Sequence, residues 1–159
     1  MTILLDTNFY GDIMLGKDLA KEVIQQAQKV LLSPIVLGEL LAGFKNGQRE
    51  KENTRQLRTF LELNDVEVVP LTQTTAEFFA LIIHQLRKAG TPLPTNDIWI
   101  AASAMETGSC LLLRQRAPDE LGATGRSDLW LALVVAGCFV QAHAAFGADF
   151  DAAPFGLPL

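Results

Sequence analysis

Short apolar runs alternate with longer segments of helical pattern over residues 2–113. Each run is three or four residues long and ends at a polar residue or a proline, which is typical of buried strands in a parallel sheet. Strands that alternate with helices predict an α/β fold in which helices cover a mostly parallel sheet. The predicted strands are residues 3–5, 30–32, 66–69 and 110–113.

Six helices are predicted between these strands. Ser33 followed by Pro34 marks a helix start, because serine caps a helix and proline is favoured at its first position. The helix that begins at Pro34 is apolar nearly all round, which predicts that it lies in the core. Thr95 or Asn96 is predicted to cap the last helix. The other predicted helices are residues 9–15, 18–29, 52–63 and 72–88.

The C-terminal part of the chain has a different composition. No lysine follows Lys88, and residues 117–159 are rich in alanine, glycine and leucine. We therefore divide the chain into a core of residues 1–114 and an atypical tail of residues 115–159 that belongs to the same domain. Within the tail, residues 127–146 are predicted to form a strongly apolar helix. The longest uncharged apolar run, residues 129–140, is too short to span a bilayer.

Composition narrows the possible functions. A chain of 159 residues with 49% hydrophobic residues predicts one compact domain. A net charge of −5 argues against a protein that coats nucleic acid by bulk electrostatics, although a nuclease with an acidic, metal-binding site remains compatible with it. The two cysteines, Cys110 and Cys138, lie among apolar residues, which predicts reduced core thiols and a cytoplasmic protein.

Three carboxylates occupy unexpected positions. Asp6 follows the first strand, where it either caps the next helix, a role also open to Thr7 and Asn8, or holds a cation. Glu39 lies inside an apolar helix, so it needs an arginine or a cation as partner. Asp97 lies in the first turn of a helix, where the helix dipole alone favours an acid.

The three carboxylates together favour a metal site. Asp6 and Asp97 would lie at one edge of the parallel sheet, and Glu39 would lie one turn inside the helix after the second strand. Three oxygen ligands around one crevice suit a hard cation such as Mg²⁺ or Mn²⁺. The sequence contains no His/Cys cluster for zinc and no glycine-rich phosphate loop.

Three segments carry a family resemblance, in the order and spacing found in that family. They are Leu4-Leu5-Asp6-Thr7-Asn8, Ser33-Pro34-Ile35-Val36-Leu37-Gly38-Glu39-Leu40 and Asn96-Asp97-Ile98-Trp99-Ile100-Ala101-Ala102. The chain resembles PIN-domain ribonucleases, specifically the VapC-type toxins of bacterial toxin–antitoxin pairs. The resemblance implies a PIN-like three-layer α/β/α sandwich whose central, mostly parallel sheet has four or five short strands.

The resemblance also implies a function. Asp6, Glu39 and Asp97 would bind Mg²⁺ or Mn²⁺ in an acidic pocket and act in the endonucleolytic cleavage of RNA. A cognate VapB-like antitoxin would neutralise the protein. We also expect a homodimer, because apolar helix faces need cover.

Neighbouring polar residues are expected to support these carboxylates. Thr7, Asn8 and Asn96 would orient them or contact phosphate. The family usually places a fourth acid shortly after the last central strand, where this chain has Gln115. Glutamine keeps an oxygen ligand but loses the charge. Acids of the tail that could replace it are Asp119, Glu120, Asp128, Asp149 and Asp151.

Two main functions therefore stay open. The first is an active ribonuclease toxin, and the second is a PIN-like module that binds RNA or protein without cutting because the fourth acid is missing. A phosphatase with Asp6 as nucleophile is a third reading, but that chemistry typically needs an acid where this chain has Asn8.

Overall fold

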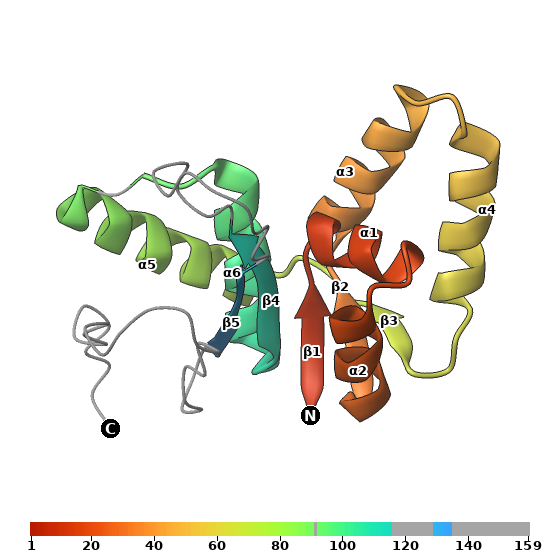
Figure 1. The fold of residues 1–159 in the computed structure, drawn as a ribbon. Helices are drawn as coiled ribbons and strands as arrows, with labels where there is room; N and C mark the ends of the chain where they lie inside the picture. The colour runs from red at the N-terminus through yellow and green to blue at the C-terminus, as the bar shows by residue number, and fades with distance from the viewer. Residues whose placement is uncertain (91, 116–128, 135–159) are drawn as a thin grey trace, which may run out of the picture.

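The computed structural model describes residues 1–90, 92–115 and 129–134, in which a five-stranded sheet lies among six helices (Figure 1). The strands are β1 (Thr2–Leu5), β2 (Lys29–Leu32), β3 (Val66–Val68), β4 (Cys110–Gln115) and β5 (Leu129–Val134). The helices are α1 (Thr7–Met14), α2 (Asp18–Gln26), α3 (Pro34–Lys45), α4 (Glu50–Leu61), α5 (Gln73–Ala89) and α6 (Thr95–Thr107).

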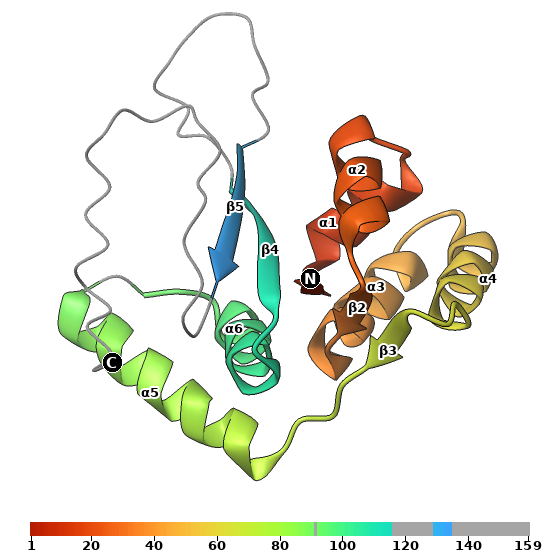
Figure 2. The ribbon, with the colours of Figure 1, turned by 90° about the horizontal axis from the view of Figure 1, so that it is seen from below.

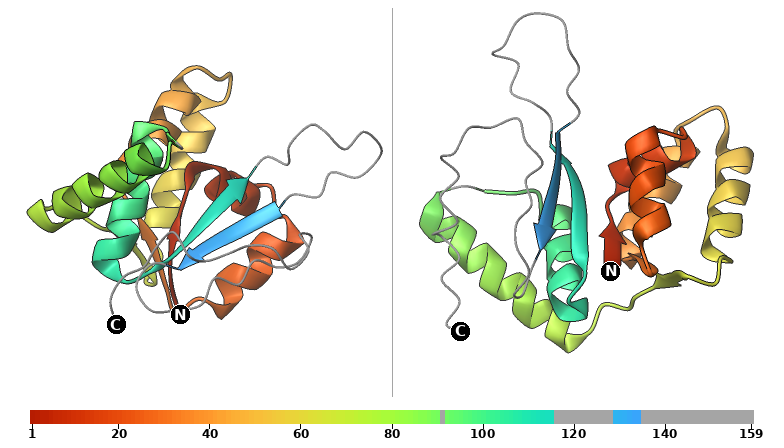
Figure 3. Two further views of the ribbon diagram at one scale, coloured as in Figure 1. Left: turned by 90° about the vertical axis from the view of Figure 1, so that its left-hand side faces the viewer. Right: turned by 60° about the horizontal axis from the view of Figure 1, so that its bottom comes forward.

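The sheet has the strand order β3-β2-β1-β4-β5. The first four strands of this order pair in parallel, and β5 pairs antiparallel with β4 at the edge (Figure 3). Helices α1 and α2 lie on one side of the sheet, and α5 and α6 lie on the other (Figure 2). These observations confirm the predicted three-layer fold with a mostly parallel sheet.

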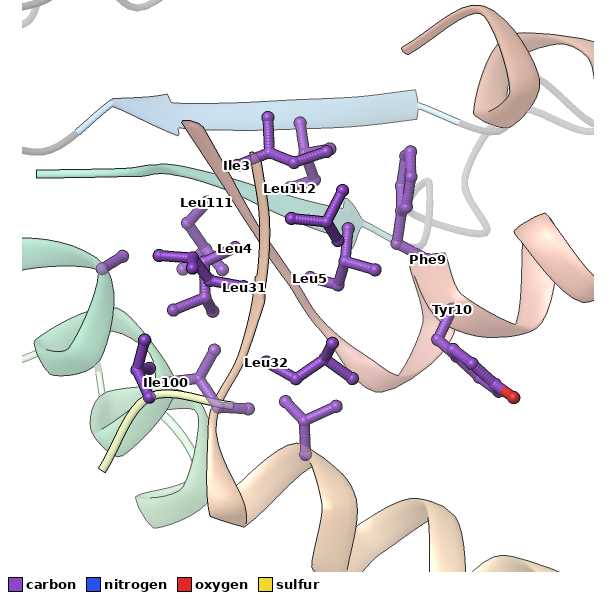
Figure 4. Close-up of a cluster of buried hydrophobic side chains, with 14 of the residues drawn as sticks. Ile3, Leu4, Leu5, Phe9, Tyr10, Leu31, Leu32, Ile100, Leu111 and Leu112 are labelled. Carbon is purple, nitrogen blue, oxygen red and sulfur yellow. The ribbon is translucent and has the colours of Figure 1, made fainter. Parts of the chain in front are cut away.

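The core consists of apolar side chains that alternate between the two faces of the central strands. Leu4 of β1 is in register with Leu31 of β2 and Leu111 of β4, and all three are almost fully buried. Figure 4 shows these three leucines near Ile100 of α6, whereas Leu5 lies toward α1. Because the strands are buried on both faces, their sequences are continuous apolar runs, which is the pattern that made them predictable.

Helix α3 is less buried than its composition predicts. Only Val36 and Leu40 are buried, while Leu41 is 41% exposed and Ala42 is exposed. The prediction of a core helix was therefore wrong, because α3 contacts α1, α4 and α6 but leaves Leu41 and Ala42 exposed. Its predicted start is confirmed, with Ser33 as the cap that accepts from the Val36 N–H at 3.3 Å.

The prediction for the tail was also wrong where the structure describes it. Residues 129–134 form strand β5, not part of a helix. The sequence Leu-Trp-Leu-Ala-Leu-Val suits a strand as well as a helix, and the open edge of β4 offers hydrogen bonds that decide between them. The rest of the predicted helix lies outside the described residues. None of the helices described is long and apolar enough to cross a membrane.

Candidate metal centre

Asp6 lies directly after β1 and is 6% exposed. Its Oδ1 accepts a hydrogen bond from the Phe9 N–H at 2.6 Å, so Asp6 is the N-cap of α1. The Asn8 side-chain amide donates to the other oxygen, Oδ2, at 3.3 Å. The capping interpretation of Asp6 is therefore correct, and its role as a metal ligand, which a capping carboxylate can also fulfil, remains a prediction.

Glu39 is half-buried on α3 and is held from two other helices. The Thr7 hydroxyl, from the first turn of α1, donates to Oε2. The Asn96 side-chain amide, from the first turn of α6, donates to Oε1 at 2.7 Å. Among the described residues no arginine pairs with Glu39. Both donors are neutral, and they orient the carboxylate without cancelling its charge.

Asn96 is available for this contact because it does not cap α6. The helix begins at Thr95 after Pro94, and no side chain caps it. The prediction that Thr95 or Asn96 is the cap was wrong, since the fixed φ of Pro94 starts the helix one residue earlier. Asn96 consequently lies within the first turn, with its amide directed toward α3.

Asp97 is half-buried in the same turn of α6. Burial and, to a smaller extent, the charge of Glu39 raise the pKa of the Asp97 carboxyl above its ordinary value of 3.8. The charge of Glu39 is thus close enough to disfavour the ionised form of Asp97. A cation beside them would offset this repulsion.

The topology brings these side chains to one edge of the sheet. Parallel strands β1 and β2 end at the same edge, so α1 and α3 both start there. Helix α6 runs back to the start of β4, so its first turn lies at this edge as well. Asp6 and Thr7 are consecutive, as are Asn96 and Asp97, and Glu39 joins the two pairs by its hydrogen bonds.

The three carboxylates are of the ligand type that suits a hard cation. Carboxylate oxygens are the ligands that Mg²⁺ and Mn²⁺ prefer. Among the residues that the structure describes, no group of three or more His, Cys, Asp or Glu side chains could by itself hold a metal ion. Asp6, Glu39 and Asp97 are instead connected through Thr7 and the Glu39–Asp97 charge interaction.

Gln115, predicted at the fourth position, is the last residue of β4. Its backbone pairs with Leu129 of β5, three residues beyond the β4 residue that pairs with Leu5. It therefore follows the strand beside β1 toward the edge that carries Asp6. The alternative acids of the tail, and Cys138, lie outside the described residues.

Sequence reasoning missed one feature of the site. Thr7 and Asn96 were expected to orient carboxylates, but the sequence did not reveal that both bind Glu39. The available signal was their position, because each adjoins an aspartate at the start of a helix.

Comparison with known proteins defines the class. The sequence pattern of the PIN domain family matches residues 3–115, so the chain belongs to the PIN domain family. Ribonuclease VapC4 of Mycobacterium tuberculosis is 32% identical over 81 residues, which cover 51% of this chain and 62% of VapC4. Ribonuclease VapC5 of the same organism is 27% identical over 101 residues, which cover 64% of this chain and 73% of VapC5. The resemblance to VapC-type proteins is confirmed, and the match spans less than two thirds of the length of VapC4.

Solved structures agree on the fold. VapBC-1 from nontypeable Haemophilus influenzae matches with a TM-score of 0.60 and 27% identity, over 70% of this chain and 84% of that chain. VapBC2 from Rickettsia felis, bound to a promoter DNA fragment, matches with a TM-score of 0.64 and 22% identity, over 72% of this chain and 88% of that chain.

Proposed function

We propose that the chain is a metal-dependent endoribonuclease, the toxin of a VapBC-type toxin–antitoxin pair. The observation that carries this proposal is the pair of hydrogen bonds from Thr7 and Asn96 to Glu39, which joins the starts of α1 and α6 to the middle of α3 in one acidic site. The relatives named as VapC ribonucleases support the same reaction.

The site residues would divide the work as follows. Asp6 and Asp97 would hold Mg²⁺ or Mn²⁺, and Glu39 would bind the ion or a water next to it. When bound, the ion would polarise the scissile phosphate and lower the pKa of the attacking water. Glu39 would orient that water and accept its proton, because two hydrogen bonds fix its carboxylate from two sides.

The partners follow from the same comparisons. One similar structure is described as a toxin–antitoxin complex and another as a member of the VapBC family of toxin–antitoxin systems, so we propose a VapB-like antitoxin for this chain. Apolar residues on exposed surfaces, such as Leu15 at 76% and Leu41 at 41% exposure, would be covered by the antitoxin or by a second copy of the chain. A cytoplasmic location is part of the proposal.

The second candidate is a module that binds RNA without cutting it. Gln115 favours it, because a neutral residue ends the strand after which the family usually has an acid. Incubation of the purified protein with RNA in the presence of Mg²⁺ or Mn²⁺ separates the two functions. The ribonuclease yields fragments with internal cut sites, whereas the binding module retains RNA of full length. Absence of both cleavage and RNA binding would contradict both functions.

Replacing Asn96 by alanine should slow RNA cleavage by about 10- to 100-fold, as is usual when a partner of a metal ligand is lost. The free energy of unfolding should change by less than about 0.5 kcal/mol, because the Asn96 side chain is exposed. Initial rates of cleavage and thermal unfolding measure the two effects. Asn64→Ala, an exposed asparagine before β3, is the matched control and should change neither. Wild-type rates in Asn96→Ala would show that the Glu39 contact is dispensable.

A further inference from the structure

A pocket of about 320 Å³ lies between the end of α5 and the start of α6. Its apolar lining includes Ile83 and Leu86 from α5, Leu93 from the connecting segment, and Ile98 from α6. The lining also includes two polar residues, Arg87 and Thr95. Figure 2 shows α5 lying beside α6, away from α1 and α2. The volume is at the lower end of the range of pockets that bind small organic groups.

The pocket and the acidic site lie on two sides of the first turn of α6. Thr95 and Ile98 line the pocket, whereas Asn96 and Asp97 belong to the site. In a helix with 3.6 residues per turn, positions 95 and 98 share one face and positions 96 and 97 lie opposite. An α-helix is about 10–12 Å wide with its side chains. A polynucleotide with a phosphate at the site could therefore reach the pocket with a neighbouring nucleotide.

The chemistry of the lining suits an unstacked base. A base has flat apolar faces and a polar edge, and proteins bind it between apolar or guanidinium surfaces with hydrogen bonds to the edge. Leu86 and Leu93 supply apolar surface, and Thr95 supplies a hydroxyl. Arg87 supplies a guanidinium that forms no ion pair with any described residue.

Arg87 also distinguishes a nucleotide from an apolar protein side chain. Lysine and arginine at the end of a helix are favoured by the helix dipole, which accounts for Arg87 and Lys88 equally. Of these two residues only Arg87 lines the pocket. A leucine or phenylalanine from a protein partner would bury the guanidinium without giving it a hydrogen-bond acceptor or a negative charge, which costs free energy. A nucleotide offers it both a base to stack on and a phosphate to bind.

We propose that this pocket binds one base of the RNA substrate next to the cleaved phosphate, with Arg87 stacked on it, and so contributes to sequence preference. The inference rests on the proposed ribonuclease function. The residues that recognise the base would then be separate from the carboxylates that act in cleavage.

The pocket can be tested without cleavage. NMR titration of the full chain with each of the four ribonucleoside monophosphates should shift the signals of Leu93, Thr95 and Ile98 for at least one base. The shifts should be lost in Arg87→Ala and kept in Lys88→Ala, which removes the same charge one residue away. The proposal would be overturned if none of the four nucleotides shifted the signals of these residues.

Cleavage kinetics give the second test. Arg87→Ala should raise KM, or lower kcat/KM, for the preferred RNA by roughly 5- to 100-fold, the range for one lost base stack. Arg87→Lys should behave similarly, because an ammonium does not stack as a guanidinium does, and Lys88→Ala should change kcat/KM less than about threefold. Equal losses of kcat/KM in Arg87→Ala and Lys88→Ala would contradict base binding in the pocket but would not contradict the ribonuclease function. A wild-type protein that binds nucleotides here but cuts no RNA would instead contradict the proposed function.

Discussion

Asp97→Asn should lower RNA cleavage by at least about 100-fold and at the same time make the folded protein more stable. Loss of a charged ligand is expected to cost no less than loss of a residue that merely orients one, for which 10- to 100-fold is typical. The stability gain follows from the raised pKa of Asp97, since burial and Glu39 both oppose its ionisation. Cleavage rates and thermal unfolding without added metal measure the two effects.

The stability gain of Asp97→Asn should depend on pH. A raised pKa means that folded Asp97 holds its proton more tightly than unfolded Asp97 does. The ionised group therefore costs stability above the folded-state pKa, and the cost disappears as the pH falls below the ordinary value of 3.8. The difference in the free energy of unfolding between Asp97→Asn and wild type should be largest at neutral pH and should vanish in acid.

Asp18→Asn is the matched control for this substitution. Asp18 also lies in the first turn of a helix, α2, but its side chain is 96% exposed and lies 3.8 Å from the ammonium of Lys21. Removing its charge should leave cleavage unchanged and lower stability by about 0.3–1 kcal/mol through the helix dipole. A destabilised Asp97→Asn variant with normal cleavage would contradict the proposed site.

Removal of divalent metal should abolish cleavage, and its addition should stabilise the fold. A bound cation supplies several kcal/mol of transition-state stabilisation, so chelation should reduce the rate roughly a thousandfold or more. A ligand present at 100 times its Kd raises the free energy of unfolding by about 2.7 kcal/mol. Thermal unfolding in a series of Mg²⁺ or Mn²⁺ concentrations measures this increase.

The position of the ion is tested by substituting its predicted ligands. The double variant Asp6→Asn/Asp97→Asn should lose the metal-dependent stabilisation. Asp18→Asn/Glu22→Gln removes two exposed acids one turn apart on α2 and should retain it. Equal stabilisation of both double variants would place the metal elsewhere.

The fold was largely predictable because buried parallel strands have a distinctive sequence. The apolar runs around Leu4, Leu31 and Leu111 are short, uninterrupted and separated by helices, and each became a central strand. The position of helix α3 was predicted, but its burial was not, because an apolar composition does not reveal which side of a helix packs against a neighbour. The strand β5 was missed because its residues suit both states, and only the edge of β4 selects one.

The candidate site was predictable only in part. The end of an apolar strand identified Asp6 as an unusual acid, and the first turn of an apolar helix identified Asp97, since both positions leave local sequence signals. The contacts of Glu39 could not be read in this way, because its partners come from distant segments and a polar residue in a helix start has several possible roles. Asn96 illustrates the difficulty. Its sequence neighbours suggested a helix cap, but in the structure its side-chain amide donates to the carboxylate of Glu39.

The two contacts of Glu39 also bear on how the chain behaves during its own synthesis. Its partners lie 32 residues earlier and 57 residues later. A nascent chain that has left the ribosome only as far as α5 contains Asp6 and Glu39 but neither Asn96 nor Asp97. The proposed nuclease would therefore stay inactive on the ribosome that makes it until α6 has emerged and folded, which leaves time for the proposed antitoxin to bind it.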